Sequence, residues 1–445
     1  MRSHDDTETI FALSSGRLPA GVAVVRVSGP AAFAAVATLS GPLPEPRLLS
    51  LRSIRTLAGD LIDRGLVAVF PGPASFTGED CVELHLHGGR AVVAAVSREL
   101  ANIPSLRIAE AGEFSLRAFT NGKFDLTTAE ALADLIEAET EAQHRFAIDN
   151  ANGRNSFLYD RWRETLLNAR AMIEAELDFP EEEDIPGSVS DQVWHSIESM
   201  LRELEGHLAS YRHSEIIREG YRVAIVGPPN AGKSSLLNAL ANRDVAIVSD
   251  EPGTTRDLVE VQLNLNGLKV ILTDTAGIRA DAGVVEQEGI RRARAVAERA
   301  DLVLLLDDHV PGPASINFAT TVPVLRIRTK IDLGALSDSR ETETADLCIS
   351  VLTGEGMTHL TDMIGSRAGD AVGSPLDAVP FRERHVAELA AARAGLEVFL
   401  SMRHGQLELA AEQLRQASNN LARIVGAIDV EDMLDTVFSR FCIGK

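Results

Sequence analysis

The sequence predicts a multidomain protein with an α+β domain at the N-terminus, an α-helical domain, and an α/β domain inserted into the helical one. Short β-type runs alternate with Ala-rich helical stretches over residues 1–124, and helical periodicity dominates 125–217 and 371–445. Strand, turn and helix patterns alternate over 218–370. A chain of 445 residues with 45% hydrophobic content is long enough for about three domains with separate cores.

The helical domain is expected to be split by the insertion, because the two ends of a domain usually lie close together and an insertion is then tolerated. An apolar repeat at helical spacing begins after residue 125, and the pattern returns near Val386. The acidic stretch 178–187 ends in Pro and Gly, which predicts a loop between helices. We therefore divide the chain into 1–124, 125–217, 218–370 and 371–445.

Composition limits the partners and the compartment. A net charge of −22 argues against a broad basic surface for nucleic acid. If the substrate is a nucleic acid, we expect a partner protein to contribute much of its binding. Cys81, Cys348 and Cys442 are scattered and lack metal-ligand spacing, which is typical of a reducing compartment. The N-terminus lacks a signal pattern and no long apolar run occurs, so we expect a cytoplasmic protein without a membrane span.

Residues 227–234 read G-P-P-N-A-G-K-S and predict a phosphate-binding loop between an apolar strand and a helix. In such a P-loop, successive backbone N–H groups point at phosphate oxygens at a helix N-terminus. Lys233 would reach the terminal phosphates, and Ser234 would place its hydroxyl on Mg²⁺. The sequence thus predicts that a nucleoside triphosphate is bound by Asn230, Ala231, Gly232, Lys233, Ser234 and Ser235.

Asp274 begins the motif D-T-A-G directly after the alternating strand 268–273. Its carboxylate would hold the magnesium shell, and the amide of Gly277 would meet the γ-phosphate, so this segment would sense hydrolysis. We expect the whole motif to bind nucleotide, through Asp274, Thr275, Ala276 and Gly277.

Guanine is the expected base. Asp332 ends the motif T-K-I-D and could accept both N–H groups of a guanine edge, a pair that adenine cannot donate. Thr329 stands where Asn is usual, as in some Rho-like GTPases, so base choice should be retained. The segment 350–356 resembles the S-A-K loop that closes over guanine. The sequence therefore predicts a Ras-like G domain whose base site contains Thr329, Lys330, Asp332, Ser350, Val351 and Leu352.

Hydrolysis needs a substitute for the glutamine of Ras-like proteins, because Ile278 follows D-T-A-G here. The segment 249–257 resembles the switch of bacterial GTPases that are activated by potassium and G-domain pairing. K⁺ would replace an arginine finger, and Thr255 would be the second hydroxyl on Mg²⁺. Alternatively, Asn230 is only a turn residue. The implied K⁺ ligands are Asn230, Ser249, Glu251 and Thr254, within a nucleotide-binding run of Ser249, Asp250, Glu251, Pro252, Gly253, Thr254 and Thr255.

The last five residues, 441–445, read F-C-I-G-K. A P-loop GTPase with this ending resembles the MnmE, or TrmE, family of tRNA-modification GTPases. The N-terminal third agrees at V-R-V-S-G-P (25–30), S-F-T-G-E-D (75–80) and N-G-K (121–123). The resemblance spans essentially the whole chain and departs from the family pattern at Thr329, Glu110, Ala111, Val351 and Leu352.

The resemblance implies a homodimeric, potassium-stimulated GTPase that drives modification of the wobble uridine of tRNA, position 34, at C5. It implies a one-carbon unit from 5-formyltetrahydrofolate or a related tetrahydrofolate. It also implies an FAD-dependent, MnmG-like partner that forms a hetero-oligomer with the chain. A regulatory GTPase switch in ribosome assembly or stress response is the alternative, and such a switch needs no folate site.

Carried over residue by residue, the family's folate contacts fall on Arg26, Glu83, Lys123 and Lys445. Glu83 suits the paired N–H donors of a pterin, and the lysines suit the carboxylates of folate. Each could instead be an exposed charge. Cys442 is either a catalytic thiol or a buried small residue, because its sequence neighbours include no His or second Cys.

The catalytic residues are expected to be Lys233, Asp274, Glu286 and Arg256. Glu286 matches the family glutamate that positions the attacking water, although a solvated helix face is the alternative. Arg256 and Arg279 could steady the switches or act as arginine fingers in trans. His85 and His87 lie two apart on a predicted strand, where partners other than a metal are more usual.

Overall fold

The computed structural model describes residues 8–178, 189–243, 245–247, 259–274, 295–307, 322–333, 345–373, 378–402 and 407–428, with 434, 437, 438, 441 and 444. These residues form two compact units. The first unit contains Met1–Ala133, Asn150–Trp194 and Val398–Lys445, and the second contains Asp134–Asp149 and His195–Glu397. The predicted fold class is confirmed: an α+β N-terminal domain, a helical domain and an α/β P-loop domain. The domain boundaries drawn from the sequence stay predictions.

The N-terminal domain is built on a six-stranded sheet with the order β3-β4-β5-β2-β1-β6. Its strands are β1 Thr9–Leu13, β2 Ala20–Ser28, β3 Ser50–Arg55, β4 Leu61–Phe70, β5 Cys81–Gly88 and β6 Leu106–Ile108. Helices α1 (Ala32–Ser40) and α2 (Arg90–Ala101) pack on one face, with the inward residues of β2 and β5. Because side chains alternate along a strand, the intervening residues of β2 and β5 lie on the opposite face. Helix α3 (Glu113–Thr120) lies at that face, where Phe114 packs on Ile10 and Ala12.

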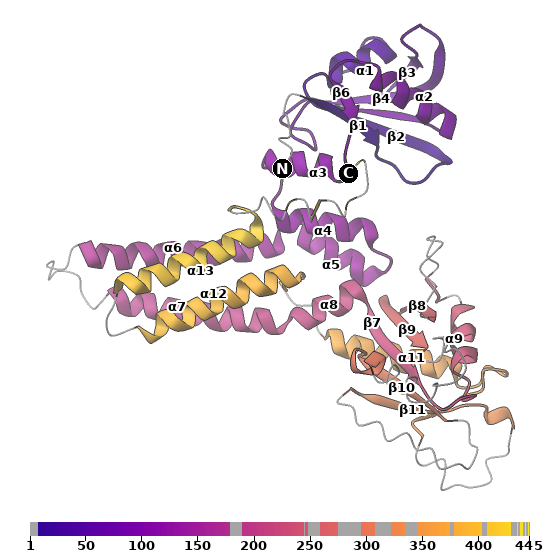
Figure 1. Ribbon diagram of the computed structural model, residues 1–445, viewed down its shortest axis with the longest axis vertical. Coiled ribbons are helices and arrows are strands. Elements are labelled where there is room, and N and C mark those ends of the chain that lie inside the picture. The colour runs from indigo at the N-terminus through magenta and orange to yellow at the C-terminus, as the bar shows by residue number, and fades with distance from the viewer. Residues whose placement is uncertain are drawn as a thin grey trace, which may run out of the picture. The chain divides into compact units, whose positions relative to one another are not determined.

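The helical domain combines helices from both ends of the sequence. They are α4 Leu126–Glu137, α5 Glu141–Ala151, α6 Arg154–Asp178, α7 Val189–Ala209, α12 Glu383–Ser401 and α13 Leu407–Val425. Helices α6 and α13 lie side by side (Figure 1), and the ring of Trp194 in α7 is 3.8 Å from the ring of Phe399 in α12. The helices before and after the insertion therefore share one core.

The inserted domain is a six-stranded sheet with the order β12-β11-β10-β7-β9-β8. The strands are β7 Tyr221–Val226, β8 Val259–Leu265, β9 Leu268–Asp274, β10 Leu302–Asp307, β11 Val324–Arg328 and β12 Leu347–Cys348, and only β8 is antiparallel to its neighbour. Its described helices are α9 Lys233–Ala241, α11 Met357–Val372 and the short 3₁₀ turn Ile331–Leu333. The carboxyl ends of β7, β9, β10 and β11 thus meet at one edge, where open α/β sheets bind ligands.

Two segments of the second unit fix the inserted domain to its neighbours. Ser214 Oγ, in α8 (Tyr211–Glu219), donates a 2.5 Å hydrogen bond to Pro380 O, where the chain returns from the insertion. In the α4–α5 turn, Glu139 pairs with Lys269 Nζ at 2.6 Å, and the Ala142 N–H donates to Gly267 O at 3.0 Å. The inserted domain is therefore held by side-chain and backbone hydrogen bonds in addition to the two peptide connections through which the chain enters and leaves it.

Acid is expected to weaken this second unit through His207, which is 7% exposed at the end of α7. Burial lowers the pKa of His207 to about 4, and nearby His385 lowers it further, while a hydrogen bond with the backbone of Ala378 opposes them. The unfolded chain takes up a proton near pH 6.5 and the folded chain does not until about pH 4. We expect the free energy of unfolding to fall by roughly 3 kcal/mol between these pH values.

Urea unfolding followed by circular dichroism at pH 7, 6 and 5 checks this loss. The variant His207→Gln stays neutral in both states and can still donate to Ala378, so its stability should fall less steeply with pH. Equal slopes for the two proteins would contradict the prediction.

Candidate functional site

The predicted phosphate loop joins the end of β7 to the start of α9. Asn230 has φ 66° and Gly232 has φ 91°, so the chain passes twice through the left-handed region before the helix begins. Glycine adopts this region without steric cost, and Asn tolerates it better than most residues. These two positions turn the loop around the N-terminus of α9, which is the geometry that receives phosphate oxygens.

Lys233 lies across this loop. Its Nζ donates hydrogen bonds to Gly227 O at 2.9 Å and to Pro228 O at 2.8 Å. Burial lowers the pKa of Lys233, and the negative charge of Asp274 opposes this effect. The ammonium group is therefore poorly hydrated, so a phosphate that reaches it meets a charge only weakly screened by water.

Two oxygen groups on different elements meet where the sequence predicts Mg²⁺. Ser234 Oγ, in the first turn of α9, donates a 2.7 Å hydrogen bond to Asp274 Oδ2 at the end of β9. Asp274 is 1% exposed. A hydroxyl and a carboxylate are the hard oxygen donors that Mg²⁺ prefers, so the residues present fit this ion.

Two of the residues predicted to recognise the base are hydrogen-bonded to the phosphate loop. Thr329 Oγ1 donates to Ala231 O at 2.8 Å, with Asp307 O at 3.2 Å, and Lys330 Nζ donates to Asn230 O. Ser350 Oγ donates to Asp332 Oδ1 and so orients that carboxylate.

The remaining predicted positions of this site differ in their surroundings. Ser235 is exposed in the first turn of α9. Val351 packs against the core of the domain, whereas Leu352 is 83% exposed. The sequence assigned Val351 and Leu352 to one loop that contacts guanine, but only Val351 is held by the core. The contact with guanine stays a prediction for both residues.

Loss of the Thr329 hydroxyl is expected to loosen the base loop. In Thr329→Val the carbonyl of Ala231, itself buried, loses its partner, which costs roughly 1–3 kcal/mol. We expect KM for GTP to rise roughly tenfold with little change in kcat. Steady-state hydrolysis measures both constants.

The control is Thr361→Val, which removes a 2.7 Å hydroxyl–carbonyl bond to Thr358 O inside α11. Equal changes in KM for the two variants would refute a role of Thr329 in the nucleotide site.

Several predicted residues lie outside the described part of the chain. They are the switch residues Ser249, Asp250, Glu251, Pro252, Gly253, Thr254, Thr255 and Arg256, then Thr275, Ala276, Gly277, Arg279 and Glu286, and in the tail Cys442 and Lys445. Their roles stay predictions.

A second polar site lies on the N-terminal sheet. Arg26 in β2 and Glu83 in β5 are register partners, on the face opposite α1 and α2. Arg26 Nη2 is 3.0 Å from Glu83 Oε1, and its guanidinium lies 5.0 Å from the ring centre of Phe76 and 5.6 Å from that of Phe114. The structure thus brings two predicted folate residues together, with two aromatic rings near the Arg26 guanidinium.

Lys123, the third of these residues, lies at the loop that carries Phe76. Its Nζ donates to Pro73 O at 2.7 Å, and the ring of the next residue, Phe124, is 6.1 Å from that of Phe76. Sequence reasoning assigned no role to Phe76 or Phe114, because rings that lie near a cation can be identified only when separate segments fold together.

The two histidines of β5 have carboxylate neighbours. His85 Nε2 lies 3.3 Å from Glu83 Oε2, and His87 Nδ1 lies 2.7 Å from Asp63 Oδ1. Among the described residues no group of three potential ligands could hold a metal ion. Burial raises the pKa of the Cys81 thiol to about 12, so this cysteine is not a nucleophile.

The sheet is parallel except at β8, and its carboxyl edge carries a phosphate loop, a lysine that lies across that loop and a Ser–Asp pair. These features define a P-loop GTPase, a GTP hydrolase. The TrmE N-terminus family matches residues 9–123, and the MnmE helical domain family matches residues 126–442. The chain belongs to the MnmE family of tRNA modification GTPases.

Two relatives named tRNA modification GTPase MnmE show the extent of the similarity. The protein of Mesorhizobium japonicum is 54% identical over 98% of this chain and 99% of its own length. The protein of Rhizobium meliloti is 54% identical over 99% of both. A crystal structure of Aquifex aeolicus Era is 28% identical over 39% of this chain and 66% of its own, with a TM-score of 0.27, too low to bear on the fold. Among the described residues, no helix is both long and apolar enough to cross a membrane.

Proposed function

We propose that GTP hydrolysis by this chain drives modification of the wobble uridine of tRNA, position 34, at C5. A tetrahydrofolate supplies the one-carbon unit, and an FAD-dependent, MnmG-like partner completes the reaction in the cytoplasm. Two relatives of nearly equal length carry the name tRNA modification GTPase MnmE, which supports the tRNA substrate.

The single observation that supports a folate site is the Arg26–Glu83 pair, whose guanidinium lies near the rings of Phe76 and Phe114. The carboxylate of Glu83 can accept hydrogen bonds from the paired N–H donors of a pterin. A nearby aromatic ring can pack against the flat pterin ring. A GTPase that works only as a binding switch has no use for such a site in a separate domain. The bound folate would supply a formyl-level carbon, and Lys123 and Lys445 would meet its carboxylates.

Titration with 5-formyltetrahydrofolate tests this site. We expect binding to the full chain and a large loss of affinity in Arg26→Ala and Glu83→Gln, with GTP hydrolysis unchanged in both. Mass spectrometry of position 34 in a deletion strain complemented with each variant tests the tRNA step. No folate binding by the unmodified chain, or normal wobble uridines in the deletion strain, would overturn the proposal and favour a regulatory switch.

The proposed hydrolysis mechanism uses potassium. Asn230 is exposed at the turn of the phosphate loop, so its side-chain oxygen is available to a monovalent cation near the phosphates. K⁺ bound there would neutralise the charge that develops between the β- and γ-phosphates. Glu286 would position the water, Thr255 would complete the Mg²⁺ shell, and Ser249, Glu251 and Thr254 would complete the K⁺ shell. Pairing of the two G domains of a homodimer would close the nucleotide site of each protomer.

Hydrolysis rates in KCl and NaCl at equal ionic strength decide this point, repeated with Asn230→Ala. A potassium-specific rate that collapses in the variant is the expected result. Equal rates in the two salts would leave Asn230 as a turn residue and would shift the catalytic role to Arg256, Arg279 or an external activator.

A further inference from the structure

The loop that carries Phe76, residues 71–80 between β4 and β5, rests on α3 and the turn after it. Asn121 Nδ2 donates to Thr77 O at 2.7 Å, and Lys123 Nζ donates to Pro73 O at 2.7 Å. Gly78, with φ 83°, approaches so closely that an added Cβ would lie 2.9 Å from the Asn121 Cβ. The loop therefore takes its position from α3.

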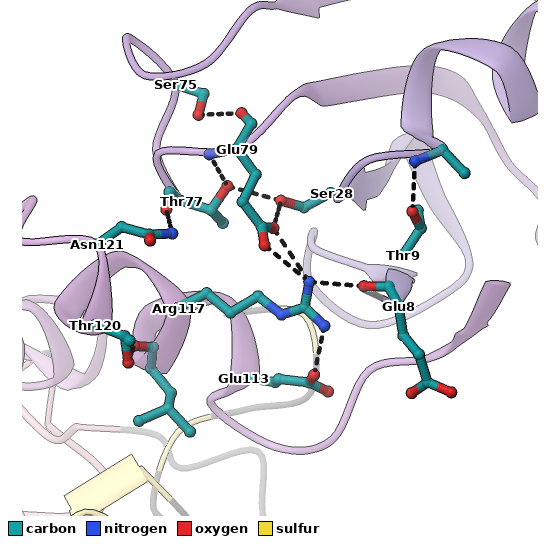
Figure 2. A network of polar contacts seen from close by, with 12 residues as sticks. Glu8, Thr9, Ser28, Ser75, Thr77, Glu79, Glu113, Arg117, Thr120 and Asn121 are labelled. Carbon is teal, nitrogen blue, oxygen red and sulfur yellow. Dashed lines mark hydrogen bonds and ion pairs between the residues drawn. The ribbon is translucent and has the colours of Figure 1, made fainter. Parts of the chain in front are cut away.

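Arg117 of α3 is the charged centre of this contact (Figure 2). Its Nη1 lies 3.1 Å from both carboxylate oxygens of Glu79 and donates to Glu8 O at 2.9 Å, while its Nη2 donates to Glu113 Oε1 at 3.1 Å. The Arg117 side chain is 11% exposed and that of Glu113 only 1%. Burial raises the pKa of Glu113, but hydrogen bonding to Arg107 and the charges of Arg107 and Arg117 outweigh it, so the pKa is lowered.

The same network reaches the strand of Arg26. Glu79 Oε2 accepts a 2.8 Å hydrogen bond from Ser28 Oγ, and Ser28 Oγ lies 2.7 Å from Thr77 Oγ1 (Figure 2). Ser28 stands two residues after Arg26 on β2, and Thr77 follows Phe76. The polar contacts thus join the strand, the loop and the helix that surround the Arg26 guanidinium.

The two rings around Arg26 depend on the two elements that Arg117 joins. Phe76 belongs to the loop of Glu79, and Phe114 follows Glu113 in the first turn of α3. Neither ring is fixed by Arg26 itself, because cation–ring contacts at 5.0 and 5.6 Å are weak and permit sliding. Phe114 is fully buried against Ile10 and Ala12, so the ion pairs of Arg117 with Glu79 and Glu113 act on the position of the Phe76 loop relative to α3.

We infer that Arg117 is a positioning residue for the Arg26 site: by pairing with Glu79 and Glu113 it holds the loop of Phe76 on α3, so that the half-exposed Phe76 ring lies beside the Arg26–Glu83 pair where a flat heteroaromatic ligand of the pterin class would bind. This inference rests on the proposed folate function. Arg117 touches neither the ligand nor Arg26 in this arrangement, and it acts through the loop and the helix.

Arg107 supplies a matched control on the other side of Glu113. Its Nη1 and Nη2 each lie 2.7 Å from a Glu113 carboxylate oxygen, and its Nε lies 2.6 Å from Glu8 Oε2. In the part of the chain that is described, the Arg107 side chain forms no hydrogen bond or ion pair with the loop 71–80, so Arg107→Gln breaks a comparable ion pair without releasing Phe76.

The experiment measures the Kd of 5-formyltetrahydrofolate by calorimetry for the full chain, Arg117→Gln, Arg107→Gln and Arg26→Ala, with thermal unfolding and GTP hydrolysis alongside. We expect Arg117→Gln to raise Kd on the order of tenfold and Arg107→Gln to change it less than about twofold, although both lower the unfolding temperature. Hydrolysis should stay unchanged, because the nucleotide site lies in another domain.

The outcomes separate cleanly. Equal Kd changes in the two arginine variants, or an unchanged Kd in Arg117→Gln, would overturn the positioning role. If Arg117→Gln does not fold, Arg117→Lys decides, because an ammonium group keeps the charge but cannot bridge both carboxylates: a raised Kd supports the inference and an unchanged one overturns it. A chain that binds no folate, or an Arg26→Ala variant that binds it normally, would instead defeat the proposed function.

Discussion

Replacement of Lys233 with alanine is expected to lower kcat/KM for GTP by on the order of 10³-fold. The Lys233 ammonium lies across the phosphate loop, and burial leaves it poorly hydrated. Alanine removes the positive charge that would neutralise the terminal phosphates, and the remaining backbone N–H groups cannot replace it. Steady-state hydrolysis and the affinity for a non-hydrolysable GTP analogue measure the loss.

Lys269→Ala is the control for this prediction, since it removes a lysine of the same domain at the opposite end of β9. Its Nζ pairs with Glu139 and lies away from the carboxyl edge of the sheet. A similar loss of kcat/KM in both variants would indicate general destabilisation and would remove Lys233 from the catalytic site.

Asp332→Asn is expected to change the base that the site accepts. The carboxylate, oriented by Ser350, would accept two N–H groups of guanine, and hydrogen bonds to a charged group contribute about 1.5–3 kcal/mol each. An amide cannot accept both, so we expect GTP affinity to fall roughly 10²- to 10⁴-fold. Xanthine has a carbonyl in place of the amino group, which the new amide can meet as a donor.

Competition binding with GTP, XTP and ATP measures this exchange. A gain in XTP affinity with restored hydrolysis of XTP is the expected result. Equal weakening toward all three nucleotides would mean that Asp332 holds the loop and does not read the base.

The sequence was sufficient to predict those parts of the candidate sites that consist of residues adjacent in the chain. The phosphate loop and Lys233 follow from an eight-residue run, and Arg26 and Glu83 were each implied as folate contacts by the family resemblance. Alternation along two strands then places both side chains on one face, which is why the structure joins them.

The sequence was insufficient where the contact joins distant segments. Nothing in the pattern around Arg117 shows that it meets Glu79, because the two lie 38 residues apart and the partner depends on how α3 packs against the sheet. The bond from Thr329 to Ala231 is a similar case, because these residues are 98 positions apart in the sequence. A sequence motif specifies residue types, whereas the packing of distant segments determines which residues contact each other.

The contact between α8 and the returning chain has a consequence for the order of folding. Ser214 and Pro380 are 166 residues apart, and an unfolded loop of that length loses considerable chain entropy when its ends meet. A G domain that has already folded brings those ends together without that loss. We therefore expect the nucleotide-binding domain to form before α12 and α13 join α6 and α7, in keeping with synthesis from the N-terminus.

The chain contains only two tryptophans, Trp162 and Trp194, and neither lies in the inserted domain. Trp194 meets Phe399, a residue made after the insertion is complete. Tryptophan fluorescence during refolding therefore reports the final assembly of the helices and does not report the earlier folding of the G domain.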